Sequence, residues 1–128
     1  MDTIDIVHVY NNITTVFCTL QIEATHNWPE CPFQEVIYLR NPHRHVFHIK
    51  AHKIVNHNDR DTEFLILKHK IINYIHEQYW DDTIKMCRFG SKSCEMLCEE
   101  LATYFDLCEI EVSEDNECGS KLVRTRVA

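Results

Sequence analysis

Glycine and proline are scarce in this chain. The sequence of 128 residues contains two glycines and three prolines, a composition that argues against disorder and against long irregular loops. No run approaches the roughly 18 consecutive apolar residues of a membrane-spanning helix, and the N-terminus has no apolar segment of the signal-peptide kind. We therefore expect a single domain, residues 1–128, that is cytoplasmic and has no membrane segment.

Positive charge is also limited. The chain has 13 Lys and Arg against 20 Asp and Glu, for a net charge of −7. Nonspecific DNA binding requires a basic surface that displaces counterions from phosphates, so we do not expect DNA as a partner. A small anionic ligand held in a local arginine pocket remains compatible with this charge.

Cysteine is frequent, but the cysteines do not have the spacings typical of metal sites or of disulfide-rich domains. The seven cysteines are odd in number and include no C-x-x-C pair, so we do not expect a disulfide framework. Cys94 and Cys98 would share one face of a helix as small core residues. Cys31 and Cys118 fall in loop-like surroundings and stay open to a chemical role.

Hydrophobic periodicity divides the chain into four strands and two helices. Alternating apolar and polar residues predict a strand, and an apolar stripe of period about 3.6 behind a capping residue predicts a helix. The predicted elements are strands at 13–26 and 43–55, helices at 64–79 and 94–105, and strands at 107–114 and 121–126. Residues 35–40 are predicted as a short extended piece, 81–90 as a loop and 118–120 as a turn, with caps at Asp61 or Thr62 and at Ser91 or Ser93.

This order predicts an α+β domain. A four-stranded antiparallel β-sheet in the order ββααββ would carry both helices on one face. The other face of such a sheet is commonly buried by a further subunit, so we expect a homo-oligomer built from dimers.

Histidines gather in two segments of this pattern. His43 and His45 are two residues apart in a predicted strand and so project from the same face, while His26 continues the apolar face of the preceding strand. Three imidazoles from two neighbouring strands suit a catalytic zinc ion, which takes three protein nitrogens and leaves one position open. The alternative is that they are polar residues buried at a subunit interface.

Basic residues offer possible contacts to an anion. The guanidinium groups of Arg44 and Arg60 could each make paired hydrogen bonds to phosphate, or could form salt bridges between subunits. Lys121 and Arg124 belong to a short basic segment near the C-terminus. This segment is either solvated or part of a local anion pocket.

Other polar and aromatic residues could contact a nucleotide base. Trp28 and Phe89, both expected in loops, could stack on a base or only anchor their loops to the core. Ser93 and Glu95 begin a helix, where free amides hold an anion or where the serine simply caps. Glu114 on an apolar strand face needs a partner, either a heterocycle N–H or an arginine.

Four motifs resemble the tunnelling fold of the 6-pyruvoyl- and 6-carboxytetrahydropterin synthases. They are Ala24–His26, His43–Phe47, Ser93–Met96 and Glu111–Glu114. This resemblance implies zinc on His26, His43 and His45, with Cys31 as the catalytic thiol. It also places the glutamate that anchors the pterin within Glu111–Glu114.

The chain also departs from the synthase pattern. Arg44 stands where the synthases have glycine, and Cys31 lies between two prolines. The aspartate and histidine that would activate the thiol have no good counterpart, since Asp81, Asp82 and His76 fit their positions poorly. A thiol without its base is a weak nucleophile at neutral pH, which weakens the enzyme hypothesis.

A second resemblance is more specific to this sequence. The segments Ala24–Trp28, Tyr38–His48, His57–Phe64, Ser93–Met96 and Val112–Gly119 resemble the phage anti-Thoeris sponge family. Its members sequester the cyclic ADP-ribose isomer made by bacterial TIR-domain enzymes, and some also hold cyclic oligonucleotides. They bind as oligomers and do not cleave the ligand.

We therefore expect an immune-evasion protein in the host cytoplasm that captures a cyclic nucleotide between subunits of an oligomer, with a hexamer as one arrangement. No catalytic residue and no cofactor is expected in this hypothesis. The predicted ligand residues are Arg60, Arg44, Trp28, Phe89, Ser93, Glu95, Met96, Glu114, Lys121 and Arg124. The alternative is a zinc-dependent pterin synthase-like lyase with His26, His43 and His45 on the metal.

Overall fold

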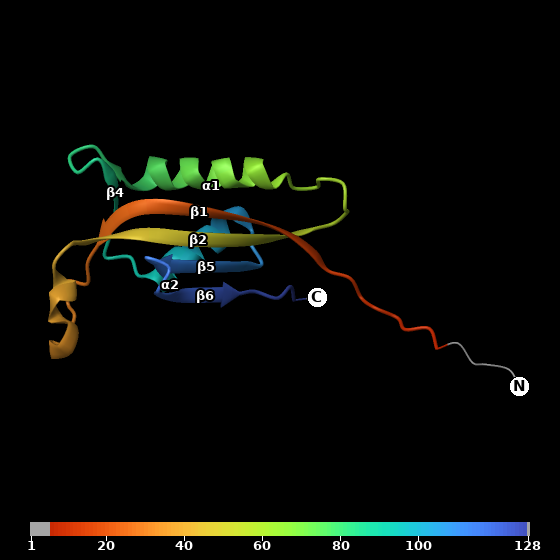
Figure 1. The fold of residues 1–128 in the computed structure, drawn as a ribbon, viewed down its shortest axis with the longest axis horizontal. Coiled ribbons are helices and arrows are strands. Elements are labelled where there is room, and N and C mark those ends of the chain that lie inside the picture. Colours follow the sequence, from red (N-terminus) through yellow and green to blue (C-terminus); the bar gives the residue numbers. More distant parts are fainter. Residues whose placement is uncertain (1–5, 128) are drawn as a thin grey trace, which may run out of the picture.

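The computed structural model, which describes residues 6–127, is an α+β domain built on a six-stranded mixed sheet (Figure 1). In chain order the elements are β1 (Thr14–His26), the 3-10 helix η1 (Gln34–Arg40), β2 (His43–Val55), α1 (Phe64–Tyr79), β3 (Trp80–Asp81), β4 (Met86–Gly90), α2 (Cys94–Phe105), β5 (Glu109–Glu114) and β6 (Cys118–Val123). The strands lie in the order β3-β4-β1-β2-β5-β6. The α+β prediction is confirmed.

The sheet differs from the predicted one between the two helices. Residues 81–90, expected as a loop, contain β4, which pairs with β3 and lies parallel to the end of β1. The four predicted strands, β1, β2, β5 and β6, pair antiparallel as expected, but the sheet has six strands and is mixed because β4 is parallel to β1. Only five residues of β4 alternate, too few for a reliable strand signal, and tertiary packing decides their conformation.

Smaller corrections concern element ends. Residues 34–40 form the helix η1 where an extended piece was expected. The side chain of Glu63, rather than Asp61 or Thr62, caps α1 by accepting from the amide of Ile66 at 2.8 Å. The turn expected at 118–120 lies at 115–117 instead, so Cys118 already belongs to β6.

Both helices cover the same face of the sheet. Leu20 of β1 pairs with Ile49 of β2, which pairs with Val112 of β5, so these three buried side chains share a face. Buried residues of α1 and α2 join them in a single core. Burial of this apolar surface is the main force that holds the helices on the sheet.

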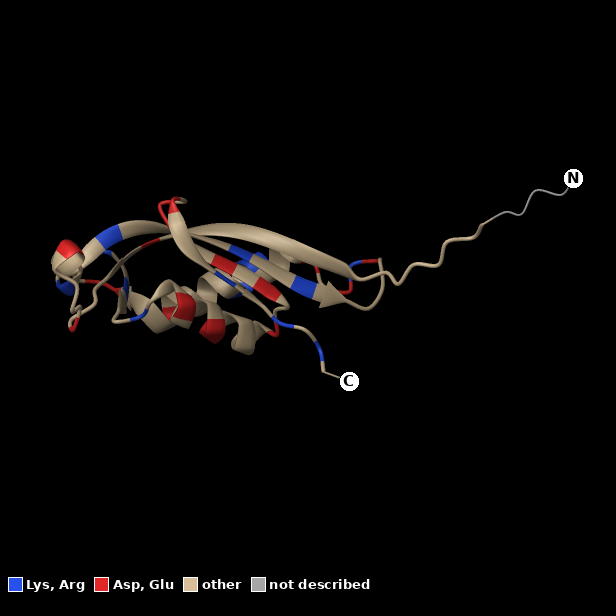
Figure 2. Cartoon of the chain, turned by 90° about the horizontal axis from the view of Figure 1, so that it is seen from below, with Lys and Arg blue, Asp and Glu red and all other residues tan. Residues whose placement is uncertain are grey.

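The opposite face of the sheet is open and charged. Acidic and basic positions lie side by side along its strands (Figure 2), and Lys121 of β6 pairs with Glu109 of β5 at 3.0 Å. We expected another subunit to cover this face, and that expectation remains a prediction.

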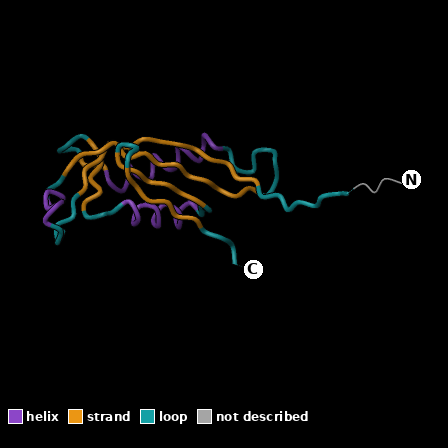
Figure 3. The backbone as a smooth tube through the Cα atoms, turned by 60° about the horizontal axis from the view of Figure 1, so that its bottom comes forward, coloured by secondary structure: helices purple, strands orange, loops and turns teal. Residues whose placement is uncertain are grey.

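The two ends of the molecule carry different features. Helix η1 lies where β1 ends and β2 begins, while the loop of residues 6–13 extends from the other end of the sheet (Figure 3). Along the described residues, no helix combines the length and the apolar character needed to cross a membrane.

Candidate metal centre and ligand groove

The three predicted histidines meet at the η1 end of the sheet. His26 is the last residue of β1 and pairs directly with His43, the first residue of β2, while His45 pairs with Ala24. Because these positions share the helix-covered face, their rings converge, with centroids 4.6 to 5.5 Å apart. The convergence follows from strand parity and register alone.

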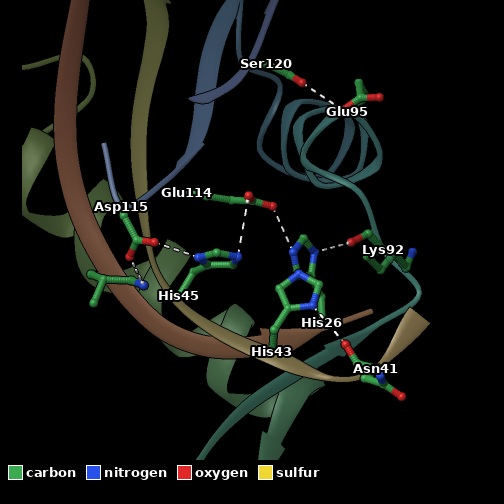
Figure 4. A network of polar contacts seen from close by, with 10 residues as sticks. His26, Asn41, His43, His45, Lys92, Glu95, Glu114, Asp115 and Ser120 are labelled. Atoms are coloured by element: carbon green, nitrogen blue, oxygen red, sulfur yellow. Dashed lines mark hydrogen bonds and ion pairs between the residues drawn. The ribbon is translucent and has the colours of Figure 1, made fainter. Parts of the chain in front are cut away.

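Glu114, the last residue of β5, completes what we call the histidine cluster: His26, His43, His45 and Glu114. Its Oε1 lies 2.8 Å from Nε2 of His26 and its Oε2 lies 3.5 Å from Nε2 of His45 (Figure 4). One ligand atom from each of the four residues lies within 4.8 Å of the others. Ligand atoms of a tetrahedral zinc ion are about 3.3 Å apart, so the most distant pair would have to approach by up to about 1.5 Å.

The outer nitrogen of each ring contacts an oxygen acceptor. These pairs are His26 Nδ1 with the Lys92 carbonyl at 3.0 Å, His43 Nδ1 with the Asn41 carbonyl at 2.9 Å, and His45 Nδ1 with Asp115 Oδ2 at 2.6 Å. An acceptor at Nδ1 keeps the proton there and leaves the Nε2 lone pair free. Metal-binding histidines are commonly oriented in this way.

Two of the three inner nitrogens make no hydrogen bond within residues 6–127. Nε2 of His26 and Nε2 of His43 are buried and make no hydrogen bond to any described residue. Glu114 Oε1 approaches Nε2 of His26 to 2.8 Å, but this contact is an ion-pair approach and not a hydrogen bond. Buried polar atoms without partners are costly and rare in proteins. A metal ion at this point would satisfy both lone pairs, so the donor set fits zinc.

The environment also favours the neutral imidazole that binds metals. Burial lowers the pKa of His26, and the neighbouring His43 and His45 act in the same direction. These effects outweigh the contact with the Lys92 carbonyl and the charge of Glu114, which favour protonation.

An open groove of about 490 Å³ adjoins the histidine cluster. It lies between the loop after β1, which carries Trp28, and the first turn of α2, which carries Met96; both side chains are substantially exposed. The groove brings together these predicted ligand residues: Trp28, Ser93, Glu95, Met96 and Glu114. An aromatic side chain, Trp28, and two hydrogen-bond acceptors, Glu95 and Glu114, therefore line the same groove.

The polar residues of the α2 turn already have protein partners. Ser93 Oγ accepts from the amide of Met96 at 3.1 Å, so the capping interpretation is confirmed. Ser120 of β6 donates to Glu95 Oε1 at 2.8 Å, which leaves the other carboxylate oxygen for a ligand (Figure 4).

The predicted basic residues lie elsewhere, and each already contacts acceptors of this chain. Arg44 pairs with Glu23 at 3.0 Å, Lys121 with Glu109 at 3.0 Å, Arg60 with Asp59 at 2.6 Å, and Arg124 binds the carbonyls of Leu107 and Ala102. The turn that holds Arg60 follows the end of β2. It is separated from His43 by about 40 Å of strand at roughly 3.3 Å per residue.

Phe89 lies in strand β4, and its expected place in a loop was wrong. Its side chain is 3% exposed and packs against Phe47 and Tyr79, with ring centroids 4.9 and 5.0 Å away. Phe89 is therefore too deeply buried to stack on a ligand base. The alternation of buried Cys87 and Phe89 around exposed Arg88 was a signal in the sequence, although a short one.

The candidate thiol does not line the groove. Cys31 is fully buried, and its Sγ contacts the carbonyls of Phe33 and Val36 at 3.8 and 3.7 Å. Cys118, by contrast, is exposed and lines the groove.

Sequence reasoning missed two residues of the site. Lys92 takes part through its backbone carbonyl, which no side-chain pattern can reveal. Asp115 follows Glu114 directly, but its role depends on a turn that was placed three residues too late.

A scan against protein-family models and a search of curated proteins found no match for this chain. The resemblances to the pterin synthases and to the phage sponges therefore stay predictions.

Proposed function

We propose that this chain is a metal-dependent binding protein for a small heterocyclic ligand, with zinc held by His26, His43 and His45. The observation that carries the proposal is the set of buried Nε2 atoms that converge without hydrogen-bond partners. Bound zinc would supply a Lewis acid beside the groove. Glu114 would either complete the metal coordination or accept a hydrogen bond from the ligand.

We infer that the ligand is a cyclic nucleotide, a cyclic ADP-ribose isomer or a cyclic oligonucleotide, which is sequestered intact in the host cytoplasm. The groove supports this inference because Trp28 offers a stacking surface while Glu95 and Glu114 offer acceptors for base N–H groups. Its volume of about 490 Å³ lies in the usual range for small-ligand sites. In the proposed homo-oligomer, Arg60 would reach the groove only from another copy.

A zinc-dependent pterin synthase-like enzyme is the second candidate. It is favoured by the position of Glu114 beside the three histidines, because the resemblance places the heterocycle-anchoring glutamate within Glu111–Glu114. The location of Cys31 speaks against it, since a fully buried thiol outside the groove cannot attack a ligand in the groove.

One experiment separates the two candidates. Zinc content is measured by elemental analysis, and zinc-loaded protein is titrated with a panel of cyclic ADP-ribose isomers and cyclic oligonucleotides. We expect one zinc per chain, tight binding of a panel member, and release of that ligand intact after heat denaturation. Turnover of dihydroneopterin triphosphate would instead support the enzyme, and absence of both zinc and ligand binding would overturn the proposal.

A matched pair of tryptophans tests the groove itself. Trp28 and Trp80 are similarly exposed, at 44% and 48%, but only Trp28 lines the groove. Loss of one base stack costs roughly 1–3 kcal/mol, so Trp28→Ala should weaken ligand binding by about 5- to 150-fold. Trp80→Ala should leave the affinity unchanged, and an equal loss in both variants would contradict the assignment of the groove.

A further inference from the structure

Asp115, the first residue of the turn between β5 and β6, contacts two consecutive residues of β2. Its Oδ2 lies 2.6 Å from Nδ1 of His45, and its Oδ1 accepts the backbone N–H of Val46 at 2.9 Å (Figure 4). Its own amide donates to the Val46 carbonyl at 2.8 Å. His45 is thus held between two carboxylates, with Asp115 at Nδ1 and Glu114 at Nε2.

The backbone of the turn fixes the place of this carboxylate. Asp115 and Asn116 have φ angles of 53° and 58°, in the left-handed region. Asp and Asn tolerate this region better than other residues with a side chain. The turn therefore presents the carboxylate to His45 by its own geometry.

His45 differs from the other two histidines in its outer contact. His26 and His43 meet backbone carbonyls at Nδ1, whereas His45 meets a charged carboxylate. A neutral imidazole can carry its proton on either nitrogen, and a carboxylate at Nδ1 selects the Nδ1–H form. The lone pair of Nε2 then faces the rest of the histidine cluster.

We propose that Asp115 is a positioning residue of the metal centre, which fixes the tautomer and the orientation of His45 so that its Nε2 can accept a metal ion. This inference rests on the proposed function for its metal, but the state of the His45 ring can be measured without one.

Asp115→Asn is the variant that tests the proposal, and Asp106→Asn is its matched control. Asp106 also has a left-handed φ of 53°, but it ends α2 and pairs with Arg124 at 3.6 Å. Asparagine keeps the left-handed backbone at both sites. At position 115, however, the asparagine NH₂ group would face either His45 Nδ1 or the Val46 amide, and neither N–H can accept its hydrogen bond. The paired contacts that fix the His45 ring are therefore lost.

The first readout is zinc affinity, measured by competition with a chelator. Asp115→Asn should weaken zinc binding by about 10- to 100-fold, the usual effect of removing an outer partner of a metal ligand. Asp106→Asn should stay within about twofold of the original protein. An unchanged affinity in Asp115→Asn, or an equal loss in the control, would overturn the proposal.

The second readout is the tautomer of His45 in the metal-free original protein, from long-range ¹H–¹⁵N spectra of the imidazoles. We expect the proton on Nδ1, and a proton on Nε2 would overturn the proposal even if Asp115→Asn failed to fold. Lack of zinc binding by the original protein would overturn the proposed function and the metal part of this inference. The tautomer would still show whether Asp115 controls His45.

Discussion

The histidine cluster and the basic residues predicted to bind phosphate differ in what already surrounds them. At the cluster, side chains from β1, β2 and β5 converge, and the buried Nε2 atoms of His26 and His43 make no hydrogen bond to a described residue. The cations at Arg44, Arg60 and Lys121 lie apart from the groove, and each is paired with an acidic neighbour.

This difference shows which polar residues indicate a site. An exposed ion pair is nearly neutral in energy and provides little free capacity for a ligand. Buried nitrogen lone pairs without a hydrogen-bond donor lower the stability of the fold, and a bound metal ion can remove this free-energy cost. Buried polar atoms that converge without hydrogen bonds are therefore better evidence for a binding site than the presence of arginine or lysine alone.

Loss of the aromatic support under the cluster should have the largest effect on stability. Phe89 packs on Phe47, and the Phe47 ring lies against the ring of His26 at 5.1 Å. Phe89→Ala should lower the free energy of unfolding by about 3–5 kcal/mol because it leaves a cavity in the core. Denaturant unfolding measures this change.

The matched control for that variant is Phe17→Ala on the open sheet face. Phe17 is 53% exposed, and its contacts are a stack with His52 and the ammonium of Lys50. We expect a loss of about 1 kcal/mol or less. Similar losses at both positions would contradict the distinction between the two faces.

Removal of one cluster histidine should separate metal binding from folding. Nε2 of His43 has no protein partner, so His43→Ala should weaken zinc binding by more than about 100-fold. The same variant should change the unfolding free energy of the metal-free protein by about 1 kcal/mol or less. Calorimetric titration and denaturant unfolding measure the two effects.

His48→Ala provides the comparison, because His48 lies on the same strand but projects from the open face. Its zinc affinity should match that of the original protein. A loss of zinc binding in His48→Ala would mean that the metal site lies elsewhere.

Glu100 of α2 accepts from Tyr74 and Tyr79 of α1 and from the Lys92 side chain, and it gives a pH-dependent test of smaller size. Burial would raise the pKa of Glu100, but hydrogen bonds from Tyr79, Lys92 and Tyr74 outweigh it and hold the pKa below its usual value of 4.5. A carboxylate with a lowered pKa stabilises the folded state above 4.5, and this contribution is lost as the pH falls through the lowered pKa.

Glu100→Gln should therefore cost about 1–3 kcal/mol of unfolding free energy near neutral pH, and the difference should shrink below pH 4.5. Glu99→Gln, at the exposed neighbouring position, serves as control and should change stability by about 0.5 kcal/mol or less. A difference that stays constant down to low pH would show that the charge of Glu100 is not what stabilises the fold.

The smallest effect is expected for Arg60→Asn, a change that keeps a residue suited to the φ of 58° at this position. If the groove of a single chain forms the whole pocket, the affinity for the cyclic nucleotide should stay within about twofold of that of the original protein. A loss of tenfold or more would show that the turn of another copy completes the pocket. Titration of both proteins with the same cyclic nucleotide measures the difference.

Much of the fold and part of the site followed from local patterns. Alternation placed His26, His43 and His45 on the buried face, and an apolar stripe with Ser93 before it located α2. These features depend on the period of a strand or a helix, which a few neighbouring residues set. The short strand β4 and the helix η1 were missed because neither has enough residues to show a period.

By itself, the sequence determined which side of each strand and helix is apolar, and hence that the three histidines share a face. Only the tertiary structure decided that β4 lies beside β1, so that Phe89 is buried, and that β5 brings Glu114 and Asp115 to both nitrogens of His45. It also decided that Arg60 lies about 40 Å of strand away from the groove. The physical reason is that periodicity is local, whereas strand order and register depend on contacts between residues far apart in the chain.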